Sequence, residues 1–497
     1  MADSLEPQAI IPDGTAPEAE AGSLLEDILA ESGPAPEGFF SEPLEPGLKA
    51  LLKGLLAMDP DGRADERRAI DGLVAELDHR VGGQLDEILH HSDFQALESA
   101  WRGLKYLVDQ TDFRENIGLE IISIDKDDLL EDFEESLEVT RSGLYKQVYT
   151  TEYGQFGGKP FAAVIANYAL GPGPRDIRLM QNMAAAATMA HSPVIASASP
   201  EFFAGEDYLN LPNLVDLKSH FEAPRFSRWR SFRESEDARS VGLTLPRILL
   251  RLPYDRENHP ISEFGYEEDV RGDVGHYLWG SAVFAFASRL TDSFARYRWC
   301  PNIIGPQGGG TVEGLPVQDF ESLRGIDTKI PTDVLISERR EFELSEEGFI
   351  SLTMRTGTKE ACFFSANSVQ KPKRFGQDRT DREAEFNYRL GTQLPYLFII
   401  TRLAHYLKVM QREEIGTWKE RIDLERELNN WIRQYIADMD VPTPGVRGRR
   451  PLRQAKITVS EVEGSPGIYR VNAMIRPHFK YMGAFFSLDL VARLDKE

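Results

Sequence analysis

The glycine-rich segment at residues 305–311, GPQGGGT, is the part of the chain best suited by composition to hold a phosphate group. A phosphate loop offers successive backbone N–H groups to the anion and usually adds a lysine beside them. This segment lacks the Gly-Lys-Ser/Thr ending, the next lysine is Lys329, and Pro306 removes one N–H donor. The pattern therefore favours a structural or assembly loop, and a soluble α/β enzyme that binds a phosphate ligand here is the alternative.

Two other groups of residues have the types that active sites use. The turn Gly171–Pro174 follows a predicted strand and precedes a predicted helix, as a dinucleotide-binding loop does, but it is not GxGxxG and contains two prolines. Asp176, His191 and Ser192 have the side chains of a hydrolase triad, but their spacing does not support one and the GxSxG nucleophile elbow is absent. The sequence therefore predicts no catalytic residue and no cofactor.

The composition of the 497 residues argues against several classes of protein. The formal net charge of −23 makes nonspecific binding to nucleic acid unfavourable. The nine histidines show no HxxxH or HExxH spacing, so no metal site is predicted. The two cysteines, Cys300 and Cys362, favour a reducing, cytoplasmic compartment. No run reaches the roughly 18 uncharged apolar residues of a membrane span, and no lysine or arginine precedes Lys49 to begin a signal peptide.

The first 48 residues differ from the rest of the chain. They contain eleven acidic residues, seven prolines and no lysine or arginine, so they bury too little apolar surface to offset the entropy of ordering and are expected to be disordered. Within them, Ser23 and Glu26 form a capping box. Four apolar residues share the helical face that follows: Leu24, Leu25, Ile28 and Leu29. This island is either a chance cluster or a short helix that docks into a groove of a partner.

The remainder of the chain alternates helices and strands, which predicts an α/β (α+β) fold with more than one domain. Helices are expected at 64–89 and 93–109. His90-His91 lie at a helix end, and Ser92 is expected to cap the start of the second helix. Five apolar residues line the second helix: Phe94, Leu97, Trp101, Leu104 and Val108. A strand is expected at 118–124, followed by a helix with the apolar residues Leu130, Phe133 and Leu137.

A strand-helix-strand unit is predicted next, with a strand at 161–166, a helix at 176–190 and a strand at 193–198. Further strand patterns occur at 333–337, 349–355 and 360–365. A long helix is expected within 386–414, started or kinked by Pro395. Its apolar stripe comprises Leu390, Leu394, Leu397, Ile400, Leu403, Leu407 and Met410.

A second long helix should follow the capping box at 417–420, and its apolar face comprises Trp418, Ile422, Leu428, Ile432, Tyr435 and Met439. Beyond it lies a basic cluster in a Pro/Gly-rich loop: Arg447, Arg449, Arg450, Arg453 and Lys456. In an acidic protein such a cluster either contacts an acidic partner surface or is simply solvated, and the sequence leaves both open.

The last strand pattern alternates along the chain. Its apolar side is formed by Phe486, Leu488, Leu490, Ala492 and Leu494. A terminal strand of this kind can pair with an exposed edge of another subunit or lie at the edge of its own sheet, and both arrangements fit the pattern.

Several blocks, taken in order, resemble the large sheath subunit of the bacterial type VI secretion system, the TssC or VipB family. They cover nearly all of the chain between residues 90 and 480. The main blocks are HSDFQALESAWRGLKYLV at 91–108, YTTEYGQFGGKPFAAVIANY at 149–168, MAAAATMAHSPVIASASPEFF at 183–203, YLWGSAVFAFASRL at 277–290 and GPQGGGTVEGLP at 305–316.

The resemblance implies a multi-domain contractile-sheath fold, like that of phage tail sheaths, with long paired helices and exchanged terminal strands. It also implies heterodimers with a small sheath subunit that polymerise on a baseplate into a helical tube around an inner tube protein and contract to propel it. An AAA+ unfoldase then recycles the contracted sheath by binding an N-terminal segment, whose counterpart here is residues 23–32. The strand at 486–494 is the candidate arm between subunits.

This resemblance suggests a division of the chain into four regions. They are an acidic segment with the docking helix (1–48), N-terminal helices that contact the small sheath subunit (49–110), an α/β sheath domain (111–380), and a C-terminal sheath domain with the helical pair and the strand arm (381–497). A free-standing adaptor that recruits a chaperone is a third possible function, and it differs in forming no polymer.

Overall fold

The computed structural model describes residues 63–492, apart from gaps at 154, 156, 257–263, 271–272, 323–324, 355–359, 374–383, 386–387, 414–420, 440–441, 462–468 and 479–487. The chain divides into two compact units, Met1–Leu77 and Asp78–Glu497. In the first unit only the beginning of helix α3 (Arg63–Leu89) is described. The motif at Leu24, Leu25, Ile28 and Leu29 therefore lies outside the described residues. All other described elements belong to the second unit.

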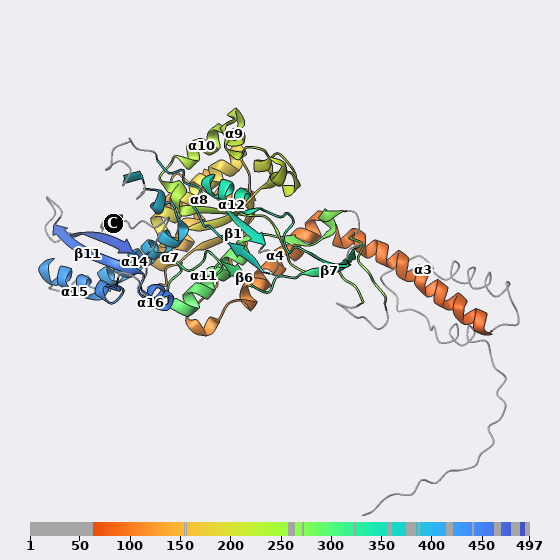
Figure 1. Ribbon diagram of the computed structural model, residues 1–497. Coiled ribbons are helices and arrows are strands. Elements are labelled where there is room, and N and C mark those ends of the chain that lie inside the picture. The colour runs from red at the N-terminus through yellow and green to blue at the C-terminus, as the bar shows by residue number, and fades with distance from the viewer. Residues whose placement is uncertain are drawn as a thin grey trace, which may run out of the picture. The chain divides into compact units, whose positions relative to one another are not determined.

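The second unit contains a six-stranded sheet, with the strand order β1-β2-β3-β9-β10-β6 (Figure 1). The first four strands in this order are parallel to one another, and β10 pairs antiparallel with both β9 and β6. Helix α8 (Pro174–Ala190) joins β1 to the parallel β2, which confirms the predicted strand-helix-strand unit. The strands are β1 (Val164–Leu170), β2 (Val194–Ala198), β3 (Val241–Leu245), β6 (Thr311–Val312), β9 (Phe349–Met354) and β10 (Ala361–Phe363).

The two faces of this sheet pack into different hydrophobic clusters. Ala196 and Ala198 of β2 belong to the cluster that includes α8, whereas Ile195 belongs to the cluster that includes α11 (Val283–Tyr297). Figure 1 shows α8 and α11 on opposite sides of β1. Because both faces are covered, β3 is buried along its whole length, as interior parallel strands usually are.

The predicted apolar stripe of the long helix is confirmed in α14 (Leu394–Glu413). Pro395 lies in the first turn, where its missing N–H removes no helical bond, so it starts the helix. Leu394 and Leu397 belong to the cluster with α11, whereas Leu403 and Leu407 belong to a third cluster with the C-terminal sheet. Helix α14 therefore joins the α/β core to the C-terminal region.

The C-terminal sheet has the order β11-β12-β13, and α15 (Arg421–Arg433) packs on β11. Leu428 and Ile432 of α15 are buried as predicted. Ile422 is 63% exposed and Met439 lies beyond the end of the helix, so these two predicted core positions were wrong. Trp418 and the capping box lie outside the described residues. The strands are β11 (Leu452–Glu461), β12 (Tyr469–Pro477) and β13 (Leu488–Ala492).

Three further predictions in the second unit were wrong. The segment at 118–124 forms no strand, and residues 333–337 likewise lie outside any strand and precede helix α12 (Glu338–Glu346). Leu137 is 86% exposed, because α5 (Lys126–Glu135) ends before it and buries only Leu130 and Phe133 of the three predicted residues. Residues 333–337 pack without forming a strand, because Val334 and Ile336 are buried in the cluster that includes α8.

The remaining elements are short, apart from α4 (Ser92–Asp109), which follows α3. No helix among the described residues is long and apolar enough to span a bilayer. The others are α6 (Gly143–Tyr145), α7 (Thr151–Tyr153), α9 (Leu217–Glu222), α10 (Ser227–Arg233), α16 (Pro444–Arg449), β4 (Ile248–Leu249), β5 (Trp279–Gly280), β7 (Gln318–Ser322) and β8 (Gly325–Lys329), with 3₁₀ or π turns between them.

Candidate functional site

Three backbone N–H groups of the glycine-rich loop already donate hydrogen bonds to backbone carbonyls of the chain. The Gly305 N–H donates to Phe363 O at 2.7 Å, and the Gly308 and Gly310 N–H groups donate to Gly305 O at 3.1 and 2.9 Å. A phosphate cradle needs these donors free and converging on one point. The loop therefore lacks the three main donors that phosphate binding would require.

Close packing explains why this loop contains glycine. A Cβ atom at Gly308 would overlap Ile304 O, and one at Gly310 would overlap Phe363 O and lie 2.6 Å from Gly305 N. Gly309 has a φ of +93°, which side chains rarely adopt. The glycines let the loop fold tightly against β10, which favours the structural role predicted for it.

A pocket of about 290 Å³ lies beside the loop, and its charges are mixed. Arg296 pairs with Asp292 at 2.8 Å, and Arg289 approaches the same carboxylate at 3.8 Å. Glu313 and Glu360 add further acidic groups to the lining. Arg447 lines the pocket as a third cation, but the carboxylates of Asp292, Glu313 and Glu360 balance the three arginines, so the lining carries no net positive charge for a phosphate.

The three residues of the considered triad are not brought together. Asp176 lies in the first turn of α8, where it accepts the Gly171 N–H at 2.7 Å and pairs with Lys126 at 3.1 Å. His191 follows the last residue of the same helix, about 22 Å away at 1.5 Å per residue. The turn at 171–174 therefore holds a carboxylate where a dinucleotide loop would hold a phosphate, and no triad exists.

His191 and His405 form a buried pair between α8 and α14. Their ring centroids are 6.4 Å apart, and His405 Nε2 contacts Ala190 O at 3.1 Å. Burial, together with the nearby Lys408, lowers the pKa of His191 to about 4. Burial also lowers the pKa of His405 to about 3. Both rings are therefore neutral near pH 7 and hold the end of α8 against α14.

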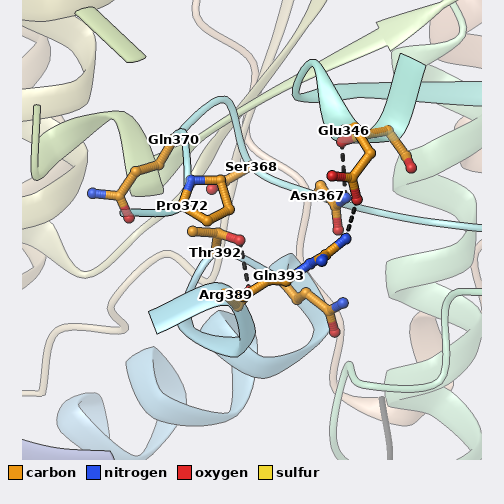
Figure 2. Close-up of a pocket in the computed structure, with 9 residues that line it drawn as sticks. Glu346, Asn367, Ser368, Gln370, Pro372, Arg389, Thr392 and Gln393 are labelled. Atoms are coloured by element: carbon orange, nitrogen blue, oxygen red, sulfur yellow. Dashed lines mark hydrogen bonds and ion pairs between the residues drawn. The ribbon is translucent and has the colours of Figure 1, made fainter. Parts of the chain in front are cut away.

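A small polar pocket lies between the end of α12 and the turn before α14 (Figure 2). Its volume of about 10 Å³ is about the minimum that admits one water molecule. The buried Ser368 Oγ and Gln393 Oε1 lack protein partners there, and Arg389 pairs with Glu346 across it. The geometry suits a structural water and leaves no room for a substrate.

Among the described residues, no three His, Cys, Asp or Glu side chains come together as ligands for a metal ion. The candidate sites that remain in the described part of the chain lie on the surface. Two surface features combine high exposure with residue types that are usually buried or paired.

The first is an apolar surface on α4, which we call the α4 face: Phe94, Leu97, Trp101 and Val108. These side chains are 37, 58, 65 and 39% exposed, although the sequence predicted them as the packing face of the helix. Helix α4 instead buries Gly103 and Leu107 against α11. A Cβ atom at Gly103 would overlap the ring of Phe284, so a glycine in mid-helix was the available signal of the buried side.

A buried ion-pair network holds α4 in this orientation. Arg251, whose side chain is 5% exposed, donates from Nε to Glu98 at 2.9 Å and from Nη1 to Glu268 at 2.5 Å. His90 Nε2 donates to the same Glu268 at 3.3 Å, and His91 caps α4 by accepting the Asp93 N–H. His90-His91 lie at a helix end as predicted, whereas the predicted cap Ser92 was wrong, because His91 occupies the cap position.

The second feature is basic and lies on α16. Arg447, Arg449 and Arg450 are exposed, and none has an ion-pair partner among the described residues. Gly448 is buried, and a Cβ atom there would overlap the ring of Tyr297 on α11. Helix α16 is thus packed against α11 through a glycine, with its arginines turned to solvent.

The predicted terminal strand pairs within its own chain. Strand β13 runs antiparallel to β12, with Leu488, Leu490 and Ala492 opposite Ile475, Ala473 and Val471. Phe486 and Leu494 lie outside the described residues. Strand β13 is also an edge of the C-terminal sheet, so its other side has no strand partner among the described residues.

Comparison with known proteins gives matches in chain order. Residues 71–370 match the family model described as EvpB/VC_A0108, tail sheath N-terminal domain, and residues 383–494 match the model described as EvpB/VC_A0108, tail sheath gpW/gp25-like domain. The chain is also 38% identical over 458 residues to the type VI secretion system sheath protein TssC1 of Pseudomonas aeruginosa, covering 91% of each chain. These matches show that the chain belongs to the VipB family of tail sheath proteins.

Proposed function

We propose that this chain is a structural subunit of a contractile type VI secretion sheath in the bacterial cytoplasm. It pairs with a small sheath subunit, and the heterodimers polymerise on a baseplate into a helical tube around an inner tube protein. Contraction of the sheath propels that tube. The observation that carries the proposal is the continuous match to a sheath protein over 91% of the chain.

The α4 face is the surface we assign to the small sheath subunit. An exposed tryptophan with three apolar neighbours is the composition of a binding hot spot, and truncating such an anchor typically costs 2–4 kcal/mol or about 30- to 1,000-fold in affinity. The buried network around Arg251 fixes the helix, so the surface is formed before binding. This assignment agrees with the role predicted for residues 49–110, which is contact with the small sheath subunit.

The arginines of α16 are the surface we assign to the inner tube protein. The chain carries a net charge of −23, so a group of unpaired cations is the part of it suited to an acidic partner. Contacts of this kind are screened by salt and release readily, as a surface that slides during contraction requires.

Two further roles rest on the family. The motif at Leu24, Leu25, Ile28 and Leu29 is the docking site that we propose for an AAA+ unfoldase, which recycles the contracted sheath. Strand β13 is the arm that we propose to link neighbouring subunits. Strand addition uses main-chain hydrogen bonds, so it joins subunits without fixing the angle between their rigid bodies.

Assembly with the small sheath subunit tests the proposal. Co-expression of the two proteins should give hollow tubules in negative-stain electron microscopy. Replacing Leu97 and Trp101 by alanine should abolish co-purification of the small subunit, because these side chains supply most of the apolar area. The melting temperature of the chain should change little, since both side chains are exposed.

A matched control is Phe342→Ala, which removes an aromatic side chain of 51% exposure from α12 instead of α4. This variant should form normal tubules. Tubules of wild-type yield from the Leu97 and Trp101 variant would show that the α4 face is not the subunit interface.

A further inference from the structure

The segment between α4 and α5 has the sequence of a strand, but it pairs with no strand in the part of the chain that the structure describes. We call residues 118–124, GLEIISI, the isoleucine segment. It follows Asn116, which has a φ of +59°, and it ends at Asp125, the extended N-cap of α5. Three of its seven residues are isoleucine, which strongly favours a pleated strand.

The backbone of the isoleucine segment is almost free of hydrogen bonds. Among the described residues its one bond is made by Ile124 O, which accepts the Tyr168 hydroxyl at 2.8 Å. Backbone N–H and C=O groups in folded proteins are nearly always paired with protein or water. Consecutive unpaired groups on an extended segment can form a ladder with an incoming strand.

The side chains are exposed in the same region. Ile121, Ile122 and Ile124 are 68, 49 and 36% exposed, while Leu119 packs against the cluster that includes α11. One end of the segment is therefore anchored, and the isoleucines that follow are presented to solvent. Adjacent apolar side chains of this size are rarely left in water on a free surface.

The free edge of the six-stranded sheet lies beside this segment. Tyr168, which bonds to Ile124, belongs to β1, and β1 is the end strand of the sheet. Asn167 and Ala169 of the same strand are exposed. An edge strand and an unpaired strand-like segment thus lie within reach of one tyrosine side chain.

The charge of this region restricts what can bind. Glu120, Asp128 and Glu131 are exposed, and no ion-pair partner is found for them among the described residues. Burial raises the pKa of Tyr168, and the Asp125 and Asp128 carboxylates raise it further, which places their charge at the edge of β1. A second copy of the isoleucine segment would bring like charges together, so charge disfavours self-pairing.

We propose that the isoleucine segment is a strand-addition site for an extended, lysine- or arginine-bearing segment of a partner protein. The incoming strand takes up the free backbone groups, covers the isoleucines with branched apolar side chains, and places its cations beside the carboxylates of α5. The proposal does not depend on the α4 face or on sheath assembly.

Binding of a model strand to the isolated full chain tests this directly. The probe is a fluorescein-labelled peptide of alternating lysine and valine, nine residues long, measured by fluorescence anisotropy. We expect saturable binding that weakens as sodium chloride is raised. The same peptide with its two central valines replaced by proline should bind at least tenfold more weakly, because proline cannot pair in a ladder. A glutamate-for-lysine peptide should not bind.

Variants of the chain locate the site. Replacing Ile122 and Ile124 by threonine keeps the β-branched shape, removes apolar area, and should weaken binding at least fivefold. Asp128→Asn should weaken it about twofold. The matched control is Val215→Thr, which makes a similar change at a side chain that is 88% exposed in another loop and should leave affinity unchanged.

Hydrogen exchange completes the test. The peptide should protect the amides of residues 118–124 and leave those around Val215 unchanged. Protection confined to other segments, equal affinity for the proline peptide, or no binding at millimolar peptide would overturn the proposal. None of these outcomes alters the tubule test of the sheath function.

Discussion

At the scale of single residues, the buried histidines make the fold sensitive to acid. His191 and His405 have folded-state pKa values of about 4 and about 3, whereas an unfolded histidine titrates near 6.5. The unfolded chain therefore takes up protons that the folded chain does not. Stability is full above about pH 6.5 and declines as the pH falls below it.

We predict that His405→Gln reduces this acid sensitivity. Between pH 7.5 and 5 the wild type should lose about 2 kcal/mol of unfolding free energy through this one group. The variant should lose correspondingly less over the same range, whatever its stability at pH 7.5. Urea denaturation at the two pH values measures the difference. His79→Gln, at an exposed position on α3, is the control, and an unchanged pH dependence in His405→Gln would refute the prediction.

The glycine-rich loop gives a second residue-scale prediction. Gly310→Ala places a Cβ atom against Phe363 O and Gly305 N, so we expect a loss of about 2 kcal/mol or more in stability. Gly445→Ala, where nothing lies within 4 Å of the added atom, should be close to neutral. Thermal melts compare the two variants. Equal melting temperatures would mean that the loop relaxes freely.

At the scale of elements, long periodic patterns were predicted well, whereas short patterns were predicted in some cases, such as β2 and β9, and not in others. The stripe of α14 and the unit β1-α8-β2 could be read because many residues repeat one spacing. The isoleucine segment has the composition of a strand, but strand formation also requires a neighbour, and composition alone does not supply one. Helix α4 shows the same limit, because its most apolar face is the one left outside.

Some features of the candidate sites could be predicted from the sequence, and others could not. Predicting a structural role for the glycine-rich loop required only the missing lysine and the proline. The Arg251 network could not be predicted, because Glu98 and Glu268 are far from each other in sequence and only the fold brings them to one arginine. The arginines of α16 were visible in the sequence as a cluster, but only the fold shows that they have no ion-pair partner among the described residues.

At the scale of the whole molecule, the sheath function that we propose requires packing between subunits and no substrate site. A contractile lattice requires two arrangements of the same subunits separated by a free-energy gap. An interface that joins unlike surfaces and does not close into a ring produces a helical polymer. The strand link at β13 and the interface at the α4 face that we propose would meet these requirements without bond chemistry.

Removing the terminal strand tests the link between subunits. Deletion of residues 484–497 removes β13 from the edge of the C-terminal sheet. We expect the truncated chain to form the heterodimer, because the α4 face is intact, and to form no tubules. Size-exclusion chromatography and negative-stain microscopy measure the two steps separately. Normal tubules from the truncated chain would exclude β13 as the arm.

Helix α14 has a mechanical consequence. Its first turns are packed with the six-stranded sheet and its later turns with the C-terminal sheet, and its 20 residues span about 30 Å. An α-helix resists stretching far better than a loop of the same length. A pull on the C-terminal strands would therefore displace the body of the subunit directly, and in the sheath that we propose force would pass from subunit to subunit through a stiff internal rod.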